Sequence, residues 1–350
     1  MKVLIVGAAG YIGGSVASKL LAQGHMVSGL ARSPDTALKL KALGITPIIG
    51  SNTDVAILHQ AASMADAVIN AADVESPYPV GTILNALRGT GKRFIQTSGS
   101  SVVGDKSGGE YSAKIYHEDT PLDALPEKIV RTAIHRQVLA AAHDGVHSVV
   151  LCPPLIYGLG TGLNPHSVQI PNMIKQAQKH GVVRYIGKGE HVWSTVHIDD
   201  VVDCYLLALE KSPPGSFYYL ENGETNFKAL TASIVKLLNM KNGSWSMDEA
   251  IQEWGPQAAW FALGSNSRVS AEKARRIWAG SPTAPICFTK LNKAAIAHSC
   301  NSKALAGIRC VSARKLNQSG DQYGTSHCTK ISLCHRPQGR RLLVVRVWKI

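Results

Sequence analysis

The chain has no long hydrophobic run. Its apolar stretches all fall short of the roughly 20 residues that a membrane-spanning helix needs. Glycines interrupt the apolar N-terminal run after four residues and no cleavage region follows, so we expect no signal peptide. With 350 residues, 45% of them hydrophobic, and a mean hydropathy of +0.01, the chain can bury a full core in one large or two smaller domains. We expect a soluble, cytoplasmic globular protein.

Cysteine is scarce, and its spacing matches no metal site. The chain has seven cysteines, none of them in a CxxC pair, and five of them lie after residue 282. His327-Cys328 and Cys334-His335 could meet around a metal ion, but their spacing fits none of the usual zinc frameworks. We therefore predict no metal site.

Acidic residues are almost missing from the last part of the chain. Residues 283–350 contain twelve Lys or Arg and a single acid, Asp321, and so carry +11 of the formal net charge of +13. We predict that residues 277–350 are a basic, Cys-containing tail that is disordered or foreign to the fold, as an altered reading frame or a retained intron would produce. The alternative is a genuine extension that binds nucleic acid or an acidic partner through counterion release. Because the charges are scattered and lack interleaved aromatics, we expect no nucleic-acid partner.

A glycine-rich turn follows the first apolar segment. Residues 3–6 form an aliphatic run typical of a strand buried on both faces of a parallel sheet, and Gly7, Gly10 and Gly13 follow it. Glycines at this spacing allow a tight turn, close approach of a pyrophosphate, and close packing of a helix on the strand. The pattern predicts a dinucleotide site with its phosphates at a helix N-terminus. The alternative is a surface turn that binds nothing.

The second expected strand, residues 26–30, ends without an acidic residue. An acid there would bind the ribose 2′-hydroxyl of NAD, whereas a nearby Arg accommodates the 2′-phosphate of NADP. This chain has Arg32 and Ser33 at that point, and no carboxylate occurs there before Asp35. We therefore predict NADP as the cofactor in preference to NAD, with Arg32 and Ser33 at its phosphate. The alternative is that Arg32 is a solvated loop charge.

Strands and helices are expected to alternate as far as residue 151. Apolar runs predict strands at 46–49, 67–70, 93–97 and 148–151. Helical spacings predict helices near 35–43, 54–63, 78–90 and 127–143. Such alternation predicts an α/β fold with a doubly wound parallel sheet, whose ligands bind at the carboxyl ends of the strands.

Five motifs follow one another along residues 1–277: GAAGYIG at 7–13, Asn70-Ala71-Ala72, TSGSSVVGD at 97–105, CPPLIYG at 152–158 and VHIDD at 196–200. In this order they resemble those of the extended and atypical short-chain dehydrogenase/reductases, the group of NAD-dependent epimerase/dehydratase-like proteins. The resemblance implies a Rossmann domain made of residues 1–155 and 190–216. It also implies a smaller, discontinuous substrate-binding region made of residues 156–189 and 217–276.

The same resemblance implies which further residues contact the cofactor. Tyr11 and Ile12 would lie along the pyrophosphate, next to the glycines. Ala71 and Ala72 would lie near the adenosine and the ribose. Pro153 would lie beside the nicotinamide.

The usual catalytic residues of this family are missing from the chain. Family members that do redox chemistry use a Ser, a Tyr, and a Lys four residues after the Tyr on the same helical face, where the ammonium lowers the pKa of the phenol. None of the ten tyrosines of this chain is followed by a Lys at that spacing. Aligned on the flanking residues, Glu127 stands in the Tyr position and Arg131 in the Lys position, and Gly99 replaces the Ser.

Chemistry would then need another arrangement. We predict that Ser98 hydrogen-bonds a substrate oxygen and that Arg131 stabilises negative charge developing on that oxygen. The alternatives are a local capping or turn role for Ser98 and an exposed helix charge for Arg131. Two functions stay open: an NAD(P)-dependent oxidoreductase or epimerase-like enzyme acting on a small carbonyl or alcohol, and a non-catalytic regulator that senses NADP. Either binds a small molecule, with no membrane partner.

Overall fold

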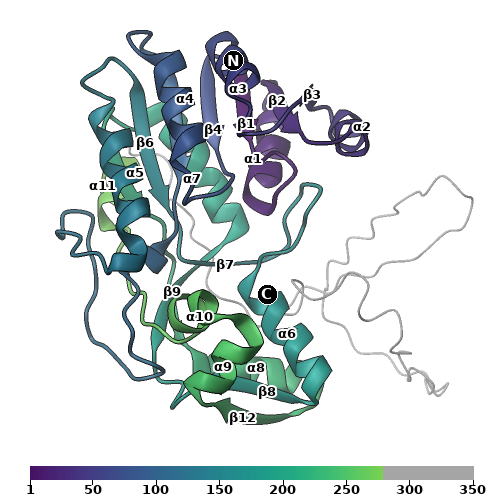
Figure 1. The fold of residues 1–350 in the computed structure, drawn as a ribbon, viewed down its shortest axis with the longest axis vertical. Coiled ribbons are helices and arrows are strands. Elements are labelled where there is room, and N and C mark those ends of the chain that lie inside the picture. The colour runs from purple at the N-terminus through teal and green to yellow at the C-terminus, as the bar shows by residue number, and fades with distance from the viewer. Residues whose placement is uncertain (279–350) are drawn as a thin grey trace, which may run out of the picture. The chain divides into compact units, whose positions relative to one another are not determined.

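A computed structural model describes residues 1–278 of the chain (Figure 1). The predicted tail, residues 277–350, lies outside the described residues from position 279 onward. Its first two residues, Ile277 and Trp278, complete the last described helix, α11 (Glu272–Trp278), and the side chain of Trp278 is buried.

Seven strands form the central sheet, in the upper part of Figure 1. Their order is β10-β6-β5-β4-β1-β2-β3, and every neighbouring pair runs parallel. The predicted α/β fold with a doubly wound parallel sheet is confirmed. The strands are β1 (Lys2–Val6), β2 (Met26–Ala31), β3 (Thr46–Ile49), β4 (Ala67–Asn70), β5 (Arg93–Thr97), β6 (His147–Cys152) and β10 (Ser216–Tyr219).

Alternate residues of a strand pack against helices on opposite faces of this sheet. In β1, Val3 and Ile5 belong to one hydrophobic core, and Leu4 and Val6 belong to the other. All four side chains are at most 1% exposed, and burying each one contributes roughly 2 kcal/mol to folding. The first face is covered by α1 (Tyr11–Ala22), α2 (Pro34–Ala42), α7 (Ile198–Lys211) and α11, and the second by α3 (Val55–Met64), α4 (Pro77–Leu87) and α5 (Ile129–Ala140).

The predicted elements of this half match the structure closely, with one difference that affects the site. The strands predicted at 46–49, 67–70 and 93–97 are confirmed residue for residue. The helix predicted near 127–143 begins instead with a short 3-10 turn, η2 (Pro126–Lys128), before α5. A 3-10 turn winds more tightly than an α-helix, so it changes the directions in which consecutive side chains point.

A second region with its own hydrophobic core lies in the lower part of Figure 1, and we call it the cap. It contains a two-stranded parallel sheet, β12-β8, and adjoins a three-stranded sheet, β11-β9-β7. The assignment of substrate binding to residues 156–189 and 217–276 stays a prediction. The elements of the cap and of the adjoining three-stranded sheet are β7 (Leu155–Tyr157), α6 (Gln169–His180), β8 (Val182–Ile186), β9 (Val192–His197), β11 (Glu224–Asn226), α8 (Phe227–Leu238), β12 (Lys241–Trp245), α9 (Met247–Trp254), α10 (Pro256–Ala258) and the π-helical turn η3 (Ala259–Leu263).

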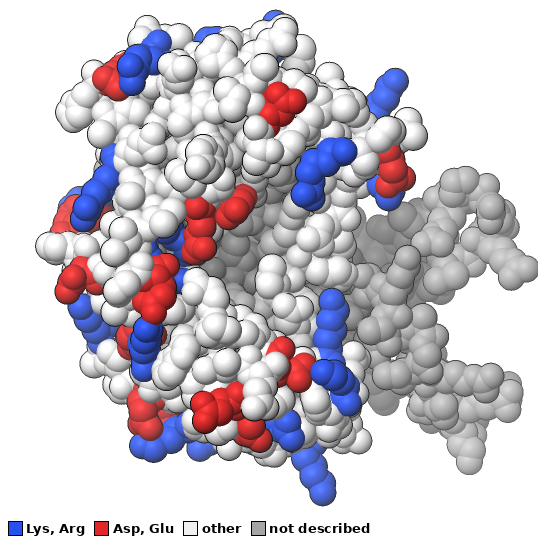
Figure 2. Space-filling model, in the orientation of Figure 1, with Lys and Arg blue, Asp and Glu red and all other residues white. Residues whose placement is uncertain are grey.

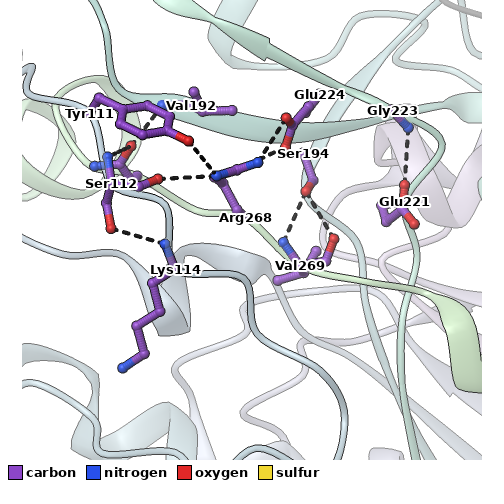
Figure 3. A network of polar contacts seen from close by, with 11 residues as sticks. Tyr111, Ser112, Lys114, Val192, Ser194, Glu221, Gly223, Glu224, Arg268 and Val269 are labelled. Atoms are coloured by element: carbon purple, nitrogen blue, oxygen red, sulfur yellow. Dashed lines mark hydrogen bonds and ion pairs between the residues drawn. The ribbon is translucent and has the colours of Figure 1, made fainter.

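One arginine ties the loop that follows β5 to the strands beneath it (Figure 3). The guanidinium group of Arg268 pairs with both carboxylate oxygens of Glu224, each at 2.9 Å. It also donates to the Tyr111 hydroxyl and to the Ser112 carbonyl oxygen, both at 3.2 Å. Bidentate arginine–carboxylate pairs are among the stronger polar contacts in proteins, so this network fixes the loop against β11.

Charged side chains of both signs share the surface. On the face seen in Figure 2, Lys and Arg lie beside Asp and Glu in both the upper and the lower part of the molecule. Within residues 1–278, no three His, Cys, Asp or Glu side chains are grouped so that they could hold a metal ion. None of the helices in that part of the chain has the length and apolar character required to cross a membrane.

A buried histidine holds η3 in place. The ring of His191 has no exposed surface and stacks on Phe227 with the ring centroids 4.2 Å apart. Its Nε2 donates to the carbonyl oxygen of Leu263, the last residue of η3, at 2.7 Å. Burial lowers the pKa of His191 to about 4, so the ring is neutral at neutral pH.

We expect the free energy of unfolding to fall as the pH drops from 6.5 to about 4, because His191 takes up a proton in the unfolded chain but stays neutral in the folded one. Its contribution is on the order of 1 kcal/mol for each pH unit in this window. Urea unfolding at a series of pH values should therefore give a flatter pH dependence for His191→Gln. His59→Gln, on the exposed side of α3, is the control, and its curve should run parallel to that of the parent protein. A His191→Gln curve as steep as the parent curve would contradict this assignment.

Candidate functional site

A cavity of about 570 Å³ lies at the carboxyl ends of β1, β2 and β4. We call it the glycine-turn cavity. The chain leaves β1 toward one face of the sheet and leaves the neighbouring β4 toward the other, and such a switch point is where doubly wound sheets bind ligands. Five of the predicted cofactor residues line this cavity, namely Gly7, Gly10, Arg32, Ala71 and Ala72.

The glycine turn brings three backbone segments together without side chains between them. Gly7 has a φ of +93°, and a Cβ atom on it would lie 2.8 Å from the carbonyl oxygen of Ala71. A Cβ on Gly13 would lie 2.3 Å from the carbonyl oxygen of Gly7. Gly10 is the N-cap of α1, and no side chain caps the first N–H groups of that helix. This cradle fits the pyrophosphate of a dinucleotide, because free N–H groups at a helix N-terminus favour anions.

Two of the predicted pyrophosphate residues turn their side chains away from the cavity. The hydroxyl of Tyr11 donates to the carbonyl oxygen of Gly158 at 2.8 Å, and burial raises the pKa of that phenol far above its usual range. Ile12 packs against the hydrophobic core that contains α1 and α7. Tyr11 and Ile12 can therefore bind an anion only through their backbone N–H groups.

The end of β2 carries a positive charge and no negative one. Arg32 is exposed and lines the glycine-turn cavity together with Thr36, Asn52 and Thr53. Among residues 1–278, no carboxylate pairs with its guanidinium group. The hydroxyl of Ser33 caps α2 by accepting from the Thr36 backbone N–H at 3.2 Å. Arg32 is therefore available to a ligand, while Ser33 already has a local partner.

The remaining predicted cofactor residues lie at the same edge of the sheet. Ala71 contacts the glycine turn, and the Ala72 backbone N–H is bound to the side chain of Asn70 at 3.3 Å. Pro153 follows β6 and is buried, and its carbonyl oxygen accepts from the Ser100 backbone N–H at 3.0 Å. Pro153 belongs to the lining of neither cavity described here.

A second cavity, of about 430 Å³, adjoins the first, because Asp73 borders both. We call it the arginine cavity. The sheet half contributes the segment after β4, the turn after β5 and the start of α5. The cap contributes apolar and aromatic groups from α9, α10 and η3, including Trp254 and Phe261. The polar and charged residues of its sheet side are Asp73, Glu75, Ser101, Lys128 and Arg131.

Arg131 is the best-connected side chain of the arginine cavity. It is 7% exposed, so the alternative of an exposed helix charge is wrong. One terminal nitrogen, Nη2, pairs with Glu75 at 2.6 Å. The other, Nη1, donates to the Ser101 hydroxyl at 2.6 Å and to the Gly99 carbonyl oxygen at 3.2 Å. The Nε–H is buried and has no acceptor among residues 1–278.

Ser98 lies next to this cluster but points elsewhere. Its Oγ is 2.5 Å from His135 Nε2, and both side chains are buried. Burial, together with the positive charge of Arg131, lowers the pKa of His135 to about 4, so the pair is neutral. The prediction that Ser98 binds a substrate oxygen stays a prediction. Ser101, which sequence reasoning passed over, is the serine whose hydroxyl reaches Arg131.

Glu127, predicted to stand in the Tyr position, and its neighbour Lys128 lie in different surroundings. Glu127 is exposed and bound to Lys106. Lys128, the next residue, is 1% exposed and borders the arginine cavity. Its Nζ lies 4.2 Å from the centroid of the Phe261 ring, and burial lowers its pKa to about 8. The only sequence signal for Lys128 was its place beside Glu127.

Several curated proteins are similar to this chain. An uncharacterised protein of Schizosaccharomyces pombe, C2A9.02, is 32% identical over 304 residues, which is 83% of this chain and 98% of the yeast protein. A 4-hydroxy-2-methyl-3-oxo-4-farnesyl-3,4-dihydroquinoline-1-oxide ketoreductase of Stigmatella aurantiaca is 28% identical, over 64% of this chain and 69% of that protein.

Solved structures are similar in fold. A dTDP-glucose 4,6-dehydratase from Bacillus anthracis, solved in complex with NAD, superposes with a TM-score of 0.65 at 17% identity, over 85% of this chain and 95% of the dehydratase. The family model described as the NAD dependent epimerase/dehydratase family matches residues 3–219. The resemblance predicted from the five motifs is therefore confirmed. The chain belongs to the NAD dependent epimerase/dehydratase family.

Proposed function

We propose that the protein is an NADP(H)-dependent reductase of small carbonyl compounds. The observation that carries this proposal is the pair of adjoining cavities, one built for a dinucleotide and the other rich in hydrogen-bond donors. Arg131 and Trp254 line the second cavity, and the Nε of Arg131 and the Nε1 of Trp254 are buried without an acceptor among residues 1–278. Buried donors of this kind are costly when unpaired, so a ligand that offers oxygen atoms stabilises them.

The cofactor is held by backbone and by one charge. The N–H groups at the start of α1, from Tyr11 to Gly13, bind the pyrophosphate. Arg32 binds the 2′-phosphate, for which a guanidinium group has matching geometry. Ala71 and Ala72 lie along the ribose. Pro153 supports the nicotinamide, which supplies a hydride when the reduced cofactor is bound.

Arg131 stabilises the negative charge that develops on the substrate oxygen. Its two terminal nitrogens are held by Glu75 and Ser101, so the guanidinium group is oriented before the substrate arrives. A donor that is fixed in advance in a cavity with little water stabilises developing negative charge strongly. Phe261 and Trp254 provide an apolar wall for the rest of the substrate. The Stigmatella relative, which is named a ketoreductase, supports a ketone as the reacting group.

The alternative proposal is a regulator that binds NADP and does not turn it over. The observation that favours it is that both terminal nitrogens of Arg131 already have acceptors inside the protein. A regulator would bind the nucleotide as tightly as a reductase does but would reduce no ketone.

Cofactor choice can be measured directly. We expect the parent protein to bind NADPH more tightly than NADH when quenching of tryptophan fluorescence is followed during titration. Arg32→Ala should weaken NADPH binding by about 10- to 100-fold, because it removes one or two charge-assisted hydrogen bonds to the 2′-phosphate, and should leave NADH binding unchanged. Lys39→Ala removes an exposed charge that pairs with Asp35 on the same helix, and it should change neither affinity. Equal effects of Arg32→Ala on both nucleotides would contradict the NADP assignment.

Reductase activity is tested with NADPH and a panel of ketones, including ethyl acetoacetate and cyclohexanone, by following NADPH absorbance. We expect Arg131→Met to lower kcat/KM by about 100- to 1,000-fold, as loss of a charge-stabilising donor does, while NADPH binding stays within about twofold. Arg136→Met, on the exposed side of the same helix, is the matched control and should keep full activity. NADPH binding without reduction of any ketone would favour the regulator instead.

A further inference from the structure

The family's tyrosine proton donor has no counterpart at Glu127. That carboxylate pairs with Lys106 on the surface and is not part of the arginine cavity. The following residue, Lys128, is part of that cavity. We propose that Lys128 donates the proton to the substrate oxygen, a role that rests on the reductase function proposed above.

The side chain of Lys128 is held at the cavity wall by an aromatic ring. Its Nζ lies 4.2 Å from the ring centroid of Phe261, which belongs to η3 of the cap. A cation over the face of an aromatic ring is attracted by the electrons of that face. Lys128 and Phe261 both border the arginine cavity, so the ammonium group lies where the sheet half and the cap meet.

No carboxylate pairs with this ammonium group. The acids that act on Lys128 through charge are Glu75 and Glu127, and each is bound to another cation, Arg131 and Lys106 respectively. Within residues 1–278 no carboxylate oxygen lies within ion-pair distance of Lys128 Nζ. A buried charge without a partner is costly, and such groups are typical of functional sites.

The surroundings favour loss of the proton near neutral pH. Burial, and after it the positive charge of Arg131, lower the pKa of Lys128 to about 8. Glu75 and Glu127 act in the opposite direction and do not cancel this effect. An acid whose pKa lies near the working pH gives up and regains its proton readily.

The other polar groups of the cavity fit this role less well. Arginine side chains do not release a proton in proteins, so an arginine is not a proton donor. Ser101 accepts from Arg131, and Glu75 is paired with the same guanidinium group. Asp73 accepts from the backbone N–H of Glu75 at 3.0 Å. Each of these oxygens already serves a positioning contact.

The chemical step balances with a reduced nicotinamide dinucleotide as the co-reactant. A C–H bond of the co-reactant breaks and a C–H bond forms at the carbonyl carbon as the hydride moves between them, while the π-electron pair of the carbonyl moves to oxygen. An N–H bond of the Lys128 ammonium group breaks, and an O–H bond forms on that oxygen. The carbonyl is reduced to an alcohol, the co-reactant is oxidised, and the neutral amine of Lys128 regains a proton from water.

The test combines a direct titration with kinetics on the full-length chain. In protein labelled with [13C]lysine, the Cε resonance that is missing from Lys128→Arg should titrate with a midpoint near pH 8. In reduction of ethyl acetoacetate, or of whichever ketone of the panel is turned over, kcat/KM should fall about tenfold per pH unit above the same pH.

Lys128→Arg keeps the positive charge over Phe261 but has no proton to give, so it should lower kcat by at least about 100-fold and remove the pH dependence. Lys114→Met removes an exposed cation that lies over another ring, with its Nζ 4.4 Å from the centroid of Tyr116, and should preserve both rate and profile. Thermal unfolding of each variant separates loss of function from loss of folding.

Three outcomes would overturn the role of Lys128. An active Lys128→Arg variant with the parent pH profile would show that Lys128 is not the proton donor, and it would not contradict the reductase function. A Cε midpoint at the ordinary lysine value, about 10.4, would do the same. A parent protein that binds NADPH but reduces no ketone would overturn the proposed function, and the role of Lys128 with it.

Discussion

The architecture depends on one close contact of three backbone segments at the carboxyl end of β1. Gly13 at the start of α1 lies against the carbonyl group of Gly7, and Gly7 lies against that of Ala71 after β4. No Cβ atom fits at either glycine, so the helix, the first strand and the fourth strand meet as closely as main chains can. The same contact leaves the glycine-turn cavity open. One packing arrangement therefore both holds the fold together and shapes the candidate binding site.

Two buried cations, Arg131 and Lys128, are the second constraint on the structure. Arg131 and Lys128 are both almost fully buried, and only Arg131 has a carboxylate partner. Holding such charges away from water costs free energy, which the rest of the fold must offset. The cap that covers them is held by contacts between residues far apart in the sequence, such as those of His191 with Leu263 and of Arg268 with Glu224. The arginine cavity therefore has two buried cations, Lys128 and Arg131, and two acids, Asp73 and Glu75, in its lining.

The two cavities are shaped by different kinds of contact. In the glycine-turn cavity, main chain lies so close to main chain that no side chain fits at Gly7 or Gly13. Beside the arginine cavity, side chains make the contacts. A Cβ on Gly99 would lie 3.7 Å from Arg131 Nη1, and the Ser101 hydroxyl and the Glu75 carboxylate hold that guanidinium group.

Local patterns in the sequence predicted the doubly wound sheet, the exact bounds of three strands, and the family. They could do so because a buried strand or a glycine turn is encoded by a short run of neighbouring residues. They were also enough to single out Arg32 and Arg131. Which of two neighbouring side chains lines the arginine cavity was decided by tertiary structure alone. Glu127 and Lys128 are adjacent, and only the tight turn of η2 and the ring of Phe261 turn the lysine inward and the glutamate outward. A one-dimensional pattern carries no information about a contact between residues so far apart in the chain.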